Sequence, residues 1–160
     1  MVHLEKINRK NVWDILRLKV AEPQKGFVSP NDVSIIEAYA SNAADGHFFP
    51  LGIYDDDIPV GFVMIGFDVD DYWDYAPQIA RGNYGIIRLM IDEARQGKGY
   101  GRTGLKLALE YIKSFPCGAA EFCWLSYKPQ NEAARNLYLS LGFAETGEMY
   151  GDESIAVYGL

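Results

Sequence analysis

The sequence predicts a mixed α/β fold, of the α+β type, in a single domain that spans residues 1–160. Paired apolar runs in the first and the last part of the chain indicate β-hairpins, and the middle of the chain follows a strand, helix, strand pattern. The hydrophobic fraction is 49% and the charged fraction is 23%, which is typical of a globular protein with a substantial core.

The first half of the chain is predicted to contain a strand, two helices and a hairpin with an acidic turn. Weak alternation indicates the strand, and apolar residues near helical spacing indicate the helices. We expect these elements over residues 3–7, 11–20, 29–43 and the two hairpin strands 48–54 and 59–68. Ser29, which precedes Pro30, is the expected start of the second helix.

The second half alternates strands and helices and ends in a pair of strands. Residues 69–83 combine acids, aromatics and a proline, which indicates a loop. The next apolar run lacks alternation and is therefore expected in the centre of the sheet. We expect strands over 84–92, 120–127, 143–150 and 153–160, and helices over 99–113 and 131–141, the last ended by Gly142.

Charge and composition narrow the classes of function. The formal net charge of −7 argues against general nucleic-acid binding and is compatible with a cationic partner. Cys117 and Cys123 are predicted to be free thiols, without a disulfide or a zinc site. The first ten residues lack the apolar core of a signal peptide, and the longest apolar run is too short to span a bilayer. We therefore expect a cytoplasmic protein with no membrane partner.

The stretch RQGKGYGRTG, residues 95–104, places glycines and basic residues at the start of a predicted helix. The first N–H groups of a helix have no partner inside it, and the helix dipole adds partial positive charge there. Glycines let successive N–H groups converge and remove the Cβ atoms that would block an anion. The stretch is therefore predicted to bind a phosphate or pyrophosphate, although a flexible turn is the alternative interpretation.

Two familiar nucleotide motifs do not fit this stretch. A P-loop requires Ser or Thr after its lysine, but Lys98 is followed by Gly99. A dinucleotide fingerprint should follow the first strand of a βαβ unit, whereas these glycines come after the fourth predicted strand. What fits is Gln-x-x-Gly-x-Gly, from Gln96 to Gly101, after the strand RLMID.

With this motif the chain resembles the GNAT superfamily of acyl-CoA-dependent N-acetyltransferases. The segment NEAARNLYLSLGF, residues 131–143, resembles a second block of the family, and a predicted strand separates the two blocks. The resemblance implies a central, mostly antiparallel sheet of about seven strands, splayed between strands 4 and 5 and flanked by about four helices. Three segments, residues 27–40, 50–68 and 88–101, together resemble the bacterial spermine/spermidine (diamine) acetyltransferases.

The resemblance implies acetyl-CoA as cosubstrate, without a metal. Backbone groups of the fourth strand are expected to pair with the pantetheine arm, and backbone N–H groups after it to hold the pyrophosphate. The implied cofactor residues are Leu89, Met90, Ile91, Gln96, Gly97, Lys98, Gly99, Tyr100, Gly101, Arg102 and Asn131. Asn131 is also a suitable N-cap for its helix.

Tyr138 occupies the family position of the general acid that assists departure of the thiolate, although a Tyr on this helix could also be a core residue. A backbone N–H near Met90 could stabilise the developing oxyanion. The general base stays open between Glu37, Asp68 and a chain of waters. His3 and His47 lie outside both motifs and are expected to be structural. Arg88 either organises acidic residues beside the substrate or belongs to a polar patch.

The resemblance implies a small-molecule amine as the acceptor, and we expect a polyamine or diamine such as spermidine or spermine. A flexible cation of this kind requires separated carboxylates and aromatic walls. The candidate substrate residues are Glu37, Asp68, Asp71 and Trp73. The alternatives are a GNAT enzyme for an aminoglycoside, an amino acid or a protein N-terminus, and a non-catalytic acyl-CoA sensor. Homodimers are common in the family.

Overall fold

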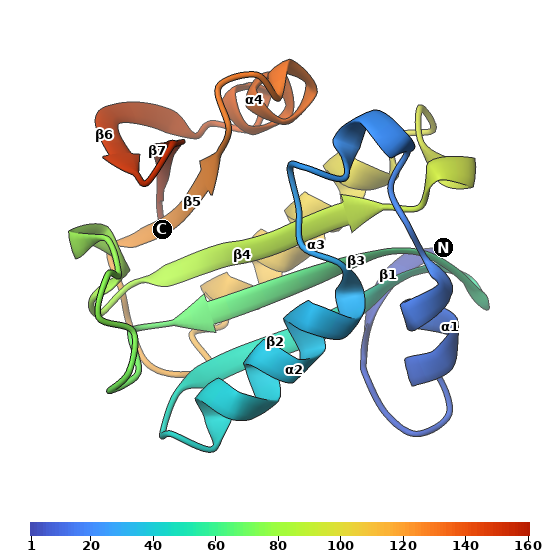
Figure 1. Cartoon of the computed structure of the whole chain (residues 1–160), viewed down its shortest axis with the longest axis horizontal. Helices are drawn as coiled ribbons and strands as arrows, with labels where there is room; N and C mark the ends of the chain where they lie inside the picture. Colours follow the sequence, from blue (N-terminus) through green and yellow to red (C-terminus); the bar gives the residue numbers. More distant parts are fainter.

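The computed structural model describes all 160 residues, and a seven-stranded sheet forms its centre (Figure 1). The strands are β1 (Val2–Lys6), β2 (His47–Asp55), β3 (Ile58–Phe67), β4 (Tyr84–Ile91), β5 (Phe122–Tyr127), β6 (Ala144–Tyr150) and β7 (Glu153–Gly159). Their order in the sheet is β1-β2-β3-β4-β5-β7-β6. The predicted mixed fold with a central fourth strand is confirmed.

Four α-helices flank this sheet: α1 (Val12–Arg17), α2 (Asn31–Asn42), α3 (Tyr100–Lys113) and α4 (Glu132–Ser140). Short 3₁₀ turns lie at η1 (Glu22–Gln24), η2 (Gln78–Ala80) and η3 (Glu93–Arg95). None of the helices combines the length and the apolar character that crossing a membrane would require.

Helices cover both faces of the sheet. On one face, α3 buries a stripe of apolar residues, among them Leu105, Leu109 and Ile112, against β1, β3 and β4. The repeat of these residues at helical spacing explains why this segment forms an amphipathic helix. On the other face, α1 and α2 pack over a second cluster that includes Ile15, Ala38 and Phe62. The central strands therefore lie between two layers of helices.

The sheet opens between β4 and β5, as the resemblance implied. These two strands are the parallel pair of the sheet, and they pair only at Tyr84–Cys123 and Gly85–Trp124. Beyond Gly85 the two strands diverge (Figure 1). A register shift in the pairing of β3 with β4 leaves Ile87 without a partner, which bends β4 at the point of divergence. The remaining length of β4 therefore has one edge unpaired.

Two predicted boundaries are wrong. Pro30, not Ser29, is the N-cap of α2, and no side chain caps this helix end. The fixed φ of proline suits the residue before a helix, and its carbonyl accepts a bond from the amide of Ser34. The first helix ends at Arg17 rather than residue 20. The backbone of Lys19 instead bonds to the segment that follows β4, through the Asp92 carboxylate and the Glu93 amide.

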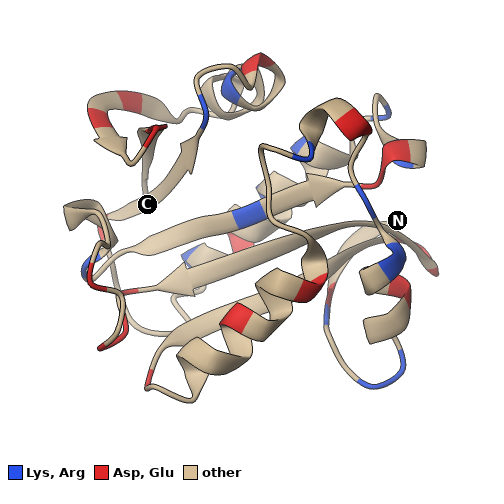
Figure 2. Cartoon of the chain, viewed as in Figure 1, with Lys and Arg blue, Asp and Glu red and all other residues tan.

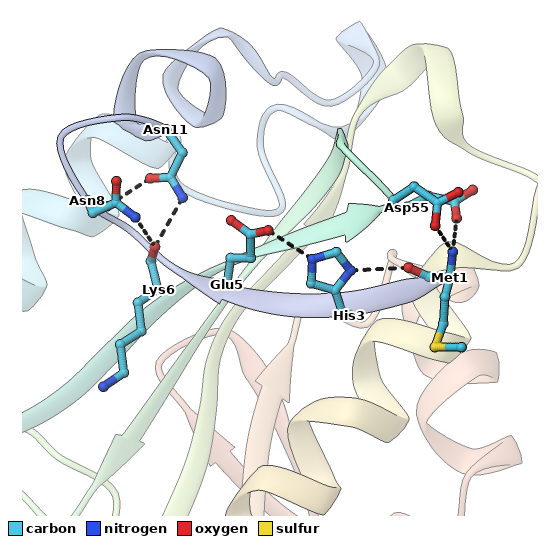
Figure 3. Close-up of polar contacts among 8 residues, drawn as sticks. Met1, His3, Glu5, Lys6, Asn8, Asn11 and Asp55 are labelled. Carbon is cyan, nitrogen blue, oxygen red and sulfur yellow. Dashed lines mark hydrogen bonds and ion pairs between the residues drawn. The ribbon is translucent and has the colours of Figure 1, made fainter.

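Polar contacts at the N-terminal edge of the sheet give His3 a structural environment (Figure 3). Its ring nitrogens contact the Glu5 carboxylate at 2.8 Å and the carbonyl of Met1 at 3.1 Å. The hydrogen bond to Glu5 raises the pKa of His3. The terminal amine of Met1 forms an ion pair with Asp55 at 3.4 Å. These contacts lie on β1, the edge strand farthest from the opening between β4 and β5.

Candidate functional site

A cavity of about 1280 Å³ occupies the opening between β4 and β5. Its walls come from the exposed part of β4, from β5, from α4, and from the loop that precedes α3. The segment between α1 and α2 crosses over β4 and closes one side (Figure 1). Helix α2, the β6–β7 hairpin and the loop residues Asp70, Tyr72 and Trp73 enclose the other end. The cavity is large enough for a cofactor-sized molecule together with a second ligand.

The glycine-rich loop lies at one end of this cavity. Gly97 and Gly99 have φ values of +75° and +84°, which residues with a Cβ atom rarely adopt. Gly99 is the N-cap of α3, and the unpaired first amides of this helix face the same region as Gly99 and Gly101, both of which line the cavity. No atom lies within 4 Å of a Cβ built on Gly97 or Gly99. The loop thus offers open space beside free N–H groups, as a phosphate site requires.

Gln96 holds this loop in place. Its side-chain amide donates to the carbonyl of Ile91 at 3.0 Å and to the side-chain oxygen of Gln24 at 2.7 Å. The loop is therefore tied both to the end of β4 and to the segment between α1 and α2. Gln96 was predicted to contact a cofactor, and although it lines the cavity, its amide N–H groups are engaged by the protein itself.

Lys98 and Arg102 are exposed and do not line the cavity. The guanidinium of Arg102 donates to the hydroxyl of Ser140 at 2.8 Å, which connects α3 to α4. The basic side chains that do line the cavity are Lys25, Arg88, Arg95 and Lys128. The backbone amides, rather than the charges of Lys98 and Arg102, are therefore the groups of this loop that could hold an anion in the cavity.

Strand β4 presents free backbone groups to the cavity. Leu89, Met90 and Ile91 line it, and on their other side they pair with β3. Since β5 has diverged by this point, their second edge can pair with an extended ligand, as an added strand would, although the carbonyl of Ile91 already accepts from Gln96. Tyr100, from the first turn of α3, also lines the cavity, but its hydroxyl donates to Asp55 at 2.7 Å.

The wall opposite β4 contains Asn131 and Tyr138. Asn131 is the N-cap of α4, and its side-chain oxygen accepts from the amide of Ala134 at 3.3 Å, so the capping role is observed. Tyr138 is 8% exposed and lines the cavity, with its ring between those of Tyr127 and Phe143. No protein group hydrogen-bonds its hydroxyl.

Burial raises the pKa of Tyr138, and the nearby charge of Glu153 raises it further. Its hydroxyl consequently keeps its proton at neutral pH. A phenol that is protonated, unpaired and adjacent to a cavity can donate a hydrogen bond to a bound ligand. The position is thus both a core position, through the aromatic packing of the ring, and a possible functional position, through the hydroxyl.

At the far end of the cavity, Arg88 on β4 forms an ion pair with Glu37 on α2 at 2.9 Å. Arg88 also donates to the carbonyl of Ile87 at 3.0 Å, whereas its buried Nε has no partner. The side chain of Arg88 is 22% exposed and that of Glu37 is 51% exposed. Arg88 therefore organises an acidic residue of the cavity, which is one of the two interpretations that its sequence context left open.

Trp73 brings the loop after β3 into the cavity wall. Its indole N–H donates to the hydroxyl of Tyr150 at 3.0 Å, 77 residues farther along the chain. The rings of Trp73, Trp124 and Tyr150 lie within about 6.3 Å of one another, and Phe48 packs beside Trp73. This aromatic wall closes the end of the cavity that is formed by α2 and the β6–β7 hairpin.

Of the two aspartates predicted to contact substrate, neither lines the cavity. Asp68 has a φ of +59° and accepts from the amide of Gly82 at 2.9 Å, so its carboxylate closes the base of its own loop. Asp71 is exposed on the outside of the loop. The neighbouring Asp70 does line the cavity, and it accepts a bond of 2.5 Å from the hydroxyl of Ser41. The sequence could not show which of these acids reaches the cavity, because they lie in an irregular loop.

Residues of the last two strands were missed as site residues. Tyr150 and Glu153 line the cavity from the β6–β7 hairpin, beside Trp124 and Ser126 of β5. They reach the site because β7 inserts between β5 and β6 in the sheet, although it is the last strand in the chain. The sequence predicted these two strands, but the strand order was needed to bring them to the cavity.

Charges are distributed unevenly along the cavity. Its acidic residues, Glu37, Asp70 and Glu153, lie on α2, the loop after β3 and the β6–β7 hairpin, where Figure 2 also shows acidic residues. Lys25 and Arg95 lie at the other end, around the glycine-rich loop. The two remaining basic residues, Arg88 and Lys128, lie near the acidic end, where they are paired with Glu37 and Asp152. One end therefore suits an anionic ligand, and the other suits a cationic one. The structure contains no group of three or more His, Cys, Asp or Glu residues that could hold a metal ion.

Comparisons with known proteins agree with this geometry. The model of the "Acetyltransferase (GNAT) family" matches residues 12–143. The chain is 27% identical, over 98% of its length and 97% of the relative's, to a spermine/spermidine N(1)-acetyltransferase of Bacillus subtilis strain 168.

Two solved structures share the fold over 99% of this chain and 95% of their own. A spermidine N-acetyltransferase from Vibrio cholerae, in complex with CoA and spermine, has a TM-score of 0.70 at 20% identity. An aminoglycoside acetyltransferase, in complex with coenzyme A and kanamycin, has a TM-score of 0.76 at 17% identity. The same fold thus accommodates two different classes of amine acceptor.

Proposed function

The chain belongs to the GNAT acetyltransferase family, and we propose that it transfers the acetyl group of acetyl-CoA to a primary amine of a polyamine or diamine, such as spermidine or spermine. The observation that carries the proposal is the two-ended cavity. One end is a glycine-rich helix entrance beside an open strand edge, and the other end combines carboxylates with aromatic rings.

Acetyl-CoA fits the first end. Its pyrophosphate would accept hydrogen bonds from the backbone amides between Gly97 and Arg102, where the dipole of α3 favours negative charge. Its pantetheine arm carries amide groups that would pair with the free edge of β4 at Leu89, Met90 and Ile91. This arrangement would place the thioester in the opening between β4 and β5.

The reaction is attack of a neutral amine on the thioester carbonyl. A new N–C bond forms, the carbonyl oxygen gains negative charge, and the C–S bond then breaks with its electron pair on sulfur. A backbone N–H near Met90 is suited to stabilise the oxyanion. The protonated hydroxyl of Tyr138 is suited to donate a hydrogen bond to the leaving thiolate, because its pKa is raised and no protein group occupies it.

The second end of the cavity favours a flexible, linear cation. Glu37 and Asp70 place two carboxylates on separate elements, and ion pairs with them would hold separated ammonium groups. The wall formed by Trp73, Trp124 and Tyr150 would cover the methylene segments, with cation–π contacts of about 0.5–2 kcal/mol each. An aminoglycoside is the second candidate, because an aminoglycoside acetyltransferase shares this fold.

The test is release of CoA thiol from acetyl-CoA with a panel of amines: spermidine, spermine, an aminoglycoside, an amino acid and a peptide. The expected result is the highest kcat/KM with spermidine or spermine. Turnover restricted to the other amines would contradict the polyamine assignment. Tight binding of acetyl-CoA without turnover of any amine would indicate a sensor instead of an enzyme.

A further inference from the structure

Glu153, the first residue of β7, is an acidic residue of the cavity without a partner. Its side chain is half-buried, and it takes part in no hydrogen bond or ion pair. The adjacent cation, Lys128, is paired with Asp152 at 3.6 Å. A half-buried carboxylate without a protein partner is costly to desolvate, which indicates a role that involves a ligand.

The sheet register directs Glu153 toward the acceptor end of the cavity. Glu153 lies opposite Tyr150 of β6, and Ser126 of β5 lies opposite Ile155, two residues farther along β7. Residues that face each other across antiparallel strands project to the same side of a sheet, as do residues two apart. Glu153 therefore shares a face with Tyr150 and Ser126, both of which line the cavity.

The other acids of the cavity are already engaged. Glu37 is held by Arg88 at 2.9 Å. Asp70 accepts from the hydroxyl of Ser41 at 2.5 Å and from the amide of Tyr72 at 2.8 Å. Either carboxylate could attract a distant ammonium group, but a bond from a cation or a hydroxyl weakens a carboxylate as a proton acceptor. Glu153 has neither kind of bond and is the cavity carboxylate that is free to accept a proton.

We propose that Glu153 is the general base of the reaction and takes a proton from the ammonium group that is to be acetylated. The proton passes from nitrogen to a carboxylate oxygen of Glu153, which leaves the neutral amine with a free electron pair. After attack and loss of the thiolate, the second proton of the nitrogen goes to the sulfur with the help of Tyr138. Glu153 returns its proton to solvent. This role rests on the proposed acetyltransferase function.

The electrostatic surroundings of Glu153 suit the task. Burial raises its pKa, and the charge of Asp152 raises it further, while Arg88 and Lys128 oppose the shift. The other titratable groups that line the cavity near the acceptor end are Tyr127 on β5, Tyr138 on α4, Tyr150 on β6, Glu37 on α2 and Asp70 in the loop after β3. A carboxylate with a raised pKa accepts a proton from an alkylammonium less unfavourably than an ordinary carboxylate does.

The decisive experiment compares the pH dependence of kcat/KM for the wild type and Glu153→Gln, with whichever amine the wild type acetylates. A free alkylammonium titrates near 10.4. Without a base, the variant depends on amine that is already neutral, so its kcat/KM should rise about tenfold per pH unit toward that value. The wild type should instead be nearly flat between the carboxylate pKa and the amine pKa. The deficit should be about 10²-fold near neutral pH and should shrink as pH rises.

Two further variants keep this test conclusive. Glu148→Gln removes an exposed carboxylate of β6 that does not line the cavity, and it should retain the wild-type profile. Glu153→Asp keeps a carboxylate and should recover part of the flat profile. Thermal unfolding shows whether each variant is folded.

A folded Glu153→Gln variant with the wild-type profile, or with a deficit that is constant with pH, would overturn the role of Glu153 alone. Absence of amine turnover by the wild type would overturn the proposed function itself.

Discussion

At the level of single residues, Tyr138 is the side chain whose packing and chemistry can be separated by one substitution. Tyr138→Phe keeps the ring between Tyr127 and Phe143 and removes only the hydroxyl. If the hydroxyl assists the leaving thiolate, kcat should fall by about 10²-fold or more, with acetyl-CoA affinity nearly unchanged. Steady-state kinetics and calorimetric titration measure the two quantities. Wild-type kcat in the Phe variant would assign Tyr138 to the core.

Adjacent aspartates provide a matched pair for the acceptor end. Asp70 lines the cavity, whereas Asp71 is exposed outside it. Removing one negative charge at each position therefore shows whether the location of the carboxylate matters. Asp70→Asn should raise the KM for spermidine by about 2- to 5-fold, the effect of losing one partly exposed ion pair, and added salt should reduce the difference. Asp71→Asn should leave the KM for spermidine and the KM for acetyl-CoA unchanged. Equal effects of the two substitutions would remove Asp70 from the acceptor site.

Glu145 supports α4 through its pH-dependent contacts. Arg135 donates to both of its carboxylate oxygens, at 2.7 and 3.1 Å, and the hydroxyl of Tyr127 also donates to it. These bonds, that from Arg135 first, lower the pKa of Glu145 to about 2. A carboxylate with a depressed pKa stabilises the fold above its ordinary pKa of 4.5, and this contribution is lost as pH falls from there toward 2.

Glu145→Gln should therefore lower the unfolding midpoint at pH 7, and the difference from the wild type should shrink as pH falls below 4.5. Glu148→Gln, on the same strand and without a partner, is the control and should show neither effect. Thermal unfolding at several pH values measures both. A deficit of Glu145→Gln that stays constant down to the lowest pH would show that the ion pair is not its cause.

Residue roles were only partly predictable from the sequence. Tyr138 and the glycines of the loop before α3 belong to local sequence motifs, and the structure places them around one cavity. Glu153 and Tyr150 have no local signal, because the order of β5, β7 and β6 brings them to the site. Asp68 and Asp71 could not be separated from Asp70, since the conformation of an irregular loop depends on contacts such as that of Asp70 with Ser41.

At the level of elements, the entrance of α3 is the feature that defines the cofactor end. A Cβ at Gly101 would meet Leu137 and Ile91 at 3.6 and 3.7 Å, which are ordinary contacts, and Gly101 has no positive φ. Gly101→Ala should therefore fold normally yet narrow the space beside the first amides of α3. Gly99→Ala is less informative, because a φ of +84° strains any side chain.

Gly101→Ala should weaken acetyl-CoA binding, and Gly101→Val should weaken it further, whereas Lys98→Ala should have little effect because its charge is exposed and screened. Calorimetric titration with acetyl-CoA measures all three affinities, and unfolding curves establish that each variant is folded. Unchanged affinity in both glycine variants would contradict the assignment of this loop to the phosphates.

The long, periodic elements could be predicted from the sequence, and the short or contact-dependent ones could not. Helix α3 has a regular apolar stripe and lies where we predicted it, over Tyr100–Lys113. The end of α1 is different, because Lys19 leaves the helix to bond with the segment after β4. No residue between 17 and 20 is a helix-ending signal. The helix ends because Lys19 bonds to Asp92, which lies more than 70 residues away in the chain.

At the level of the whole molecule, the separation of β4 from β5 opens the sheet and leaves room for the cavity. Helices pack on both faces of the central strands, so these strands have an apolar core on each side of the sheet. The net charge of −7 and the acids around one end of the cavity favour a cationic ligand there, which agrees with the proposed polyamine acceptor. The end of the cavity beside the entrance of α3 differs, because Lys25 and Arg95 line it.

The most direct measurement of the function is a competition in one vessel. Spermidine, an aminoglycoside and a peptide at equal concentrations are incubated with the protein and limiting acetyl-CoA, and the acetylated products are quantified by mass spectrometry. The ratio of products equals the ratio of kcat/KM values, which measures discrimination between acceptors. We expect acetylated spermidine to dominate the products. Acetylation of the aminoglycoside or the peptide in its place would contradict a polyamine acetyltransferase.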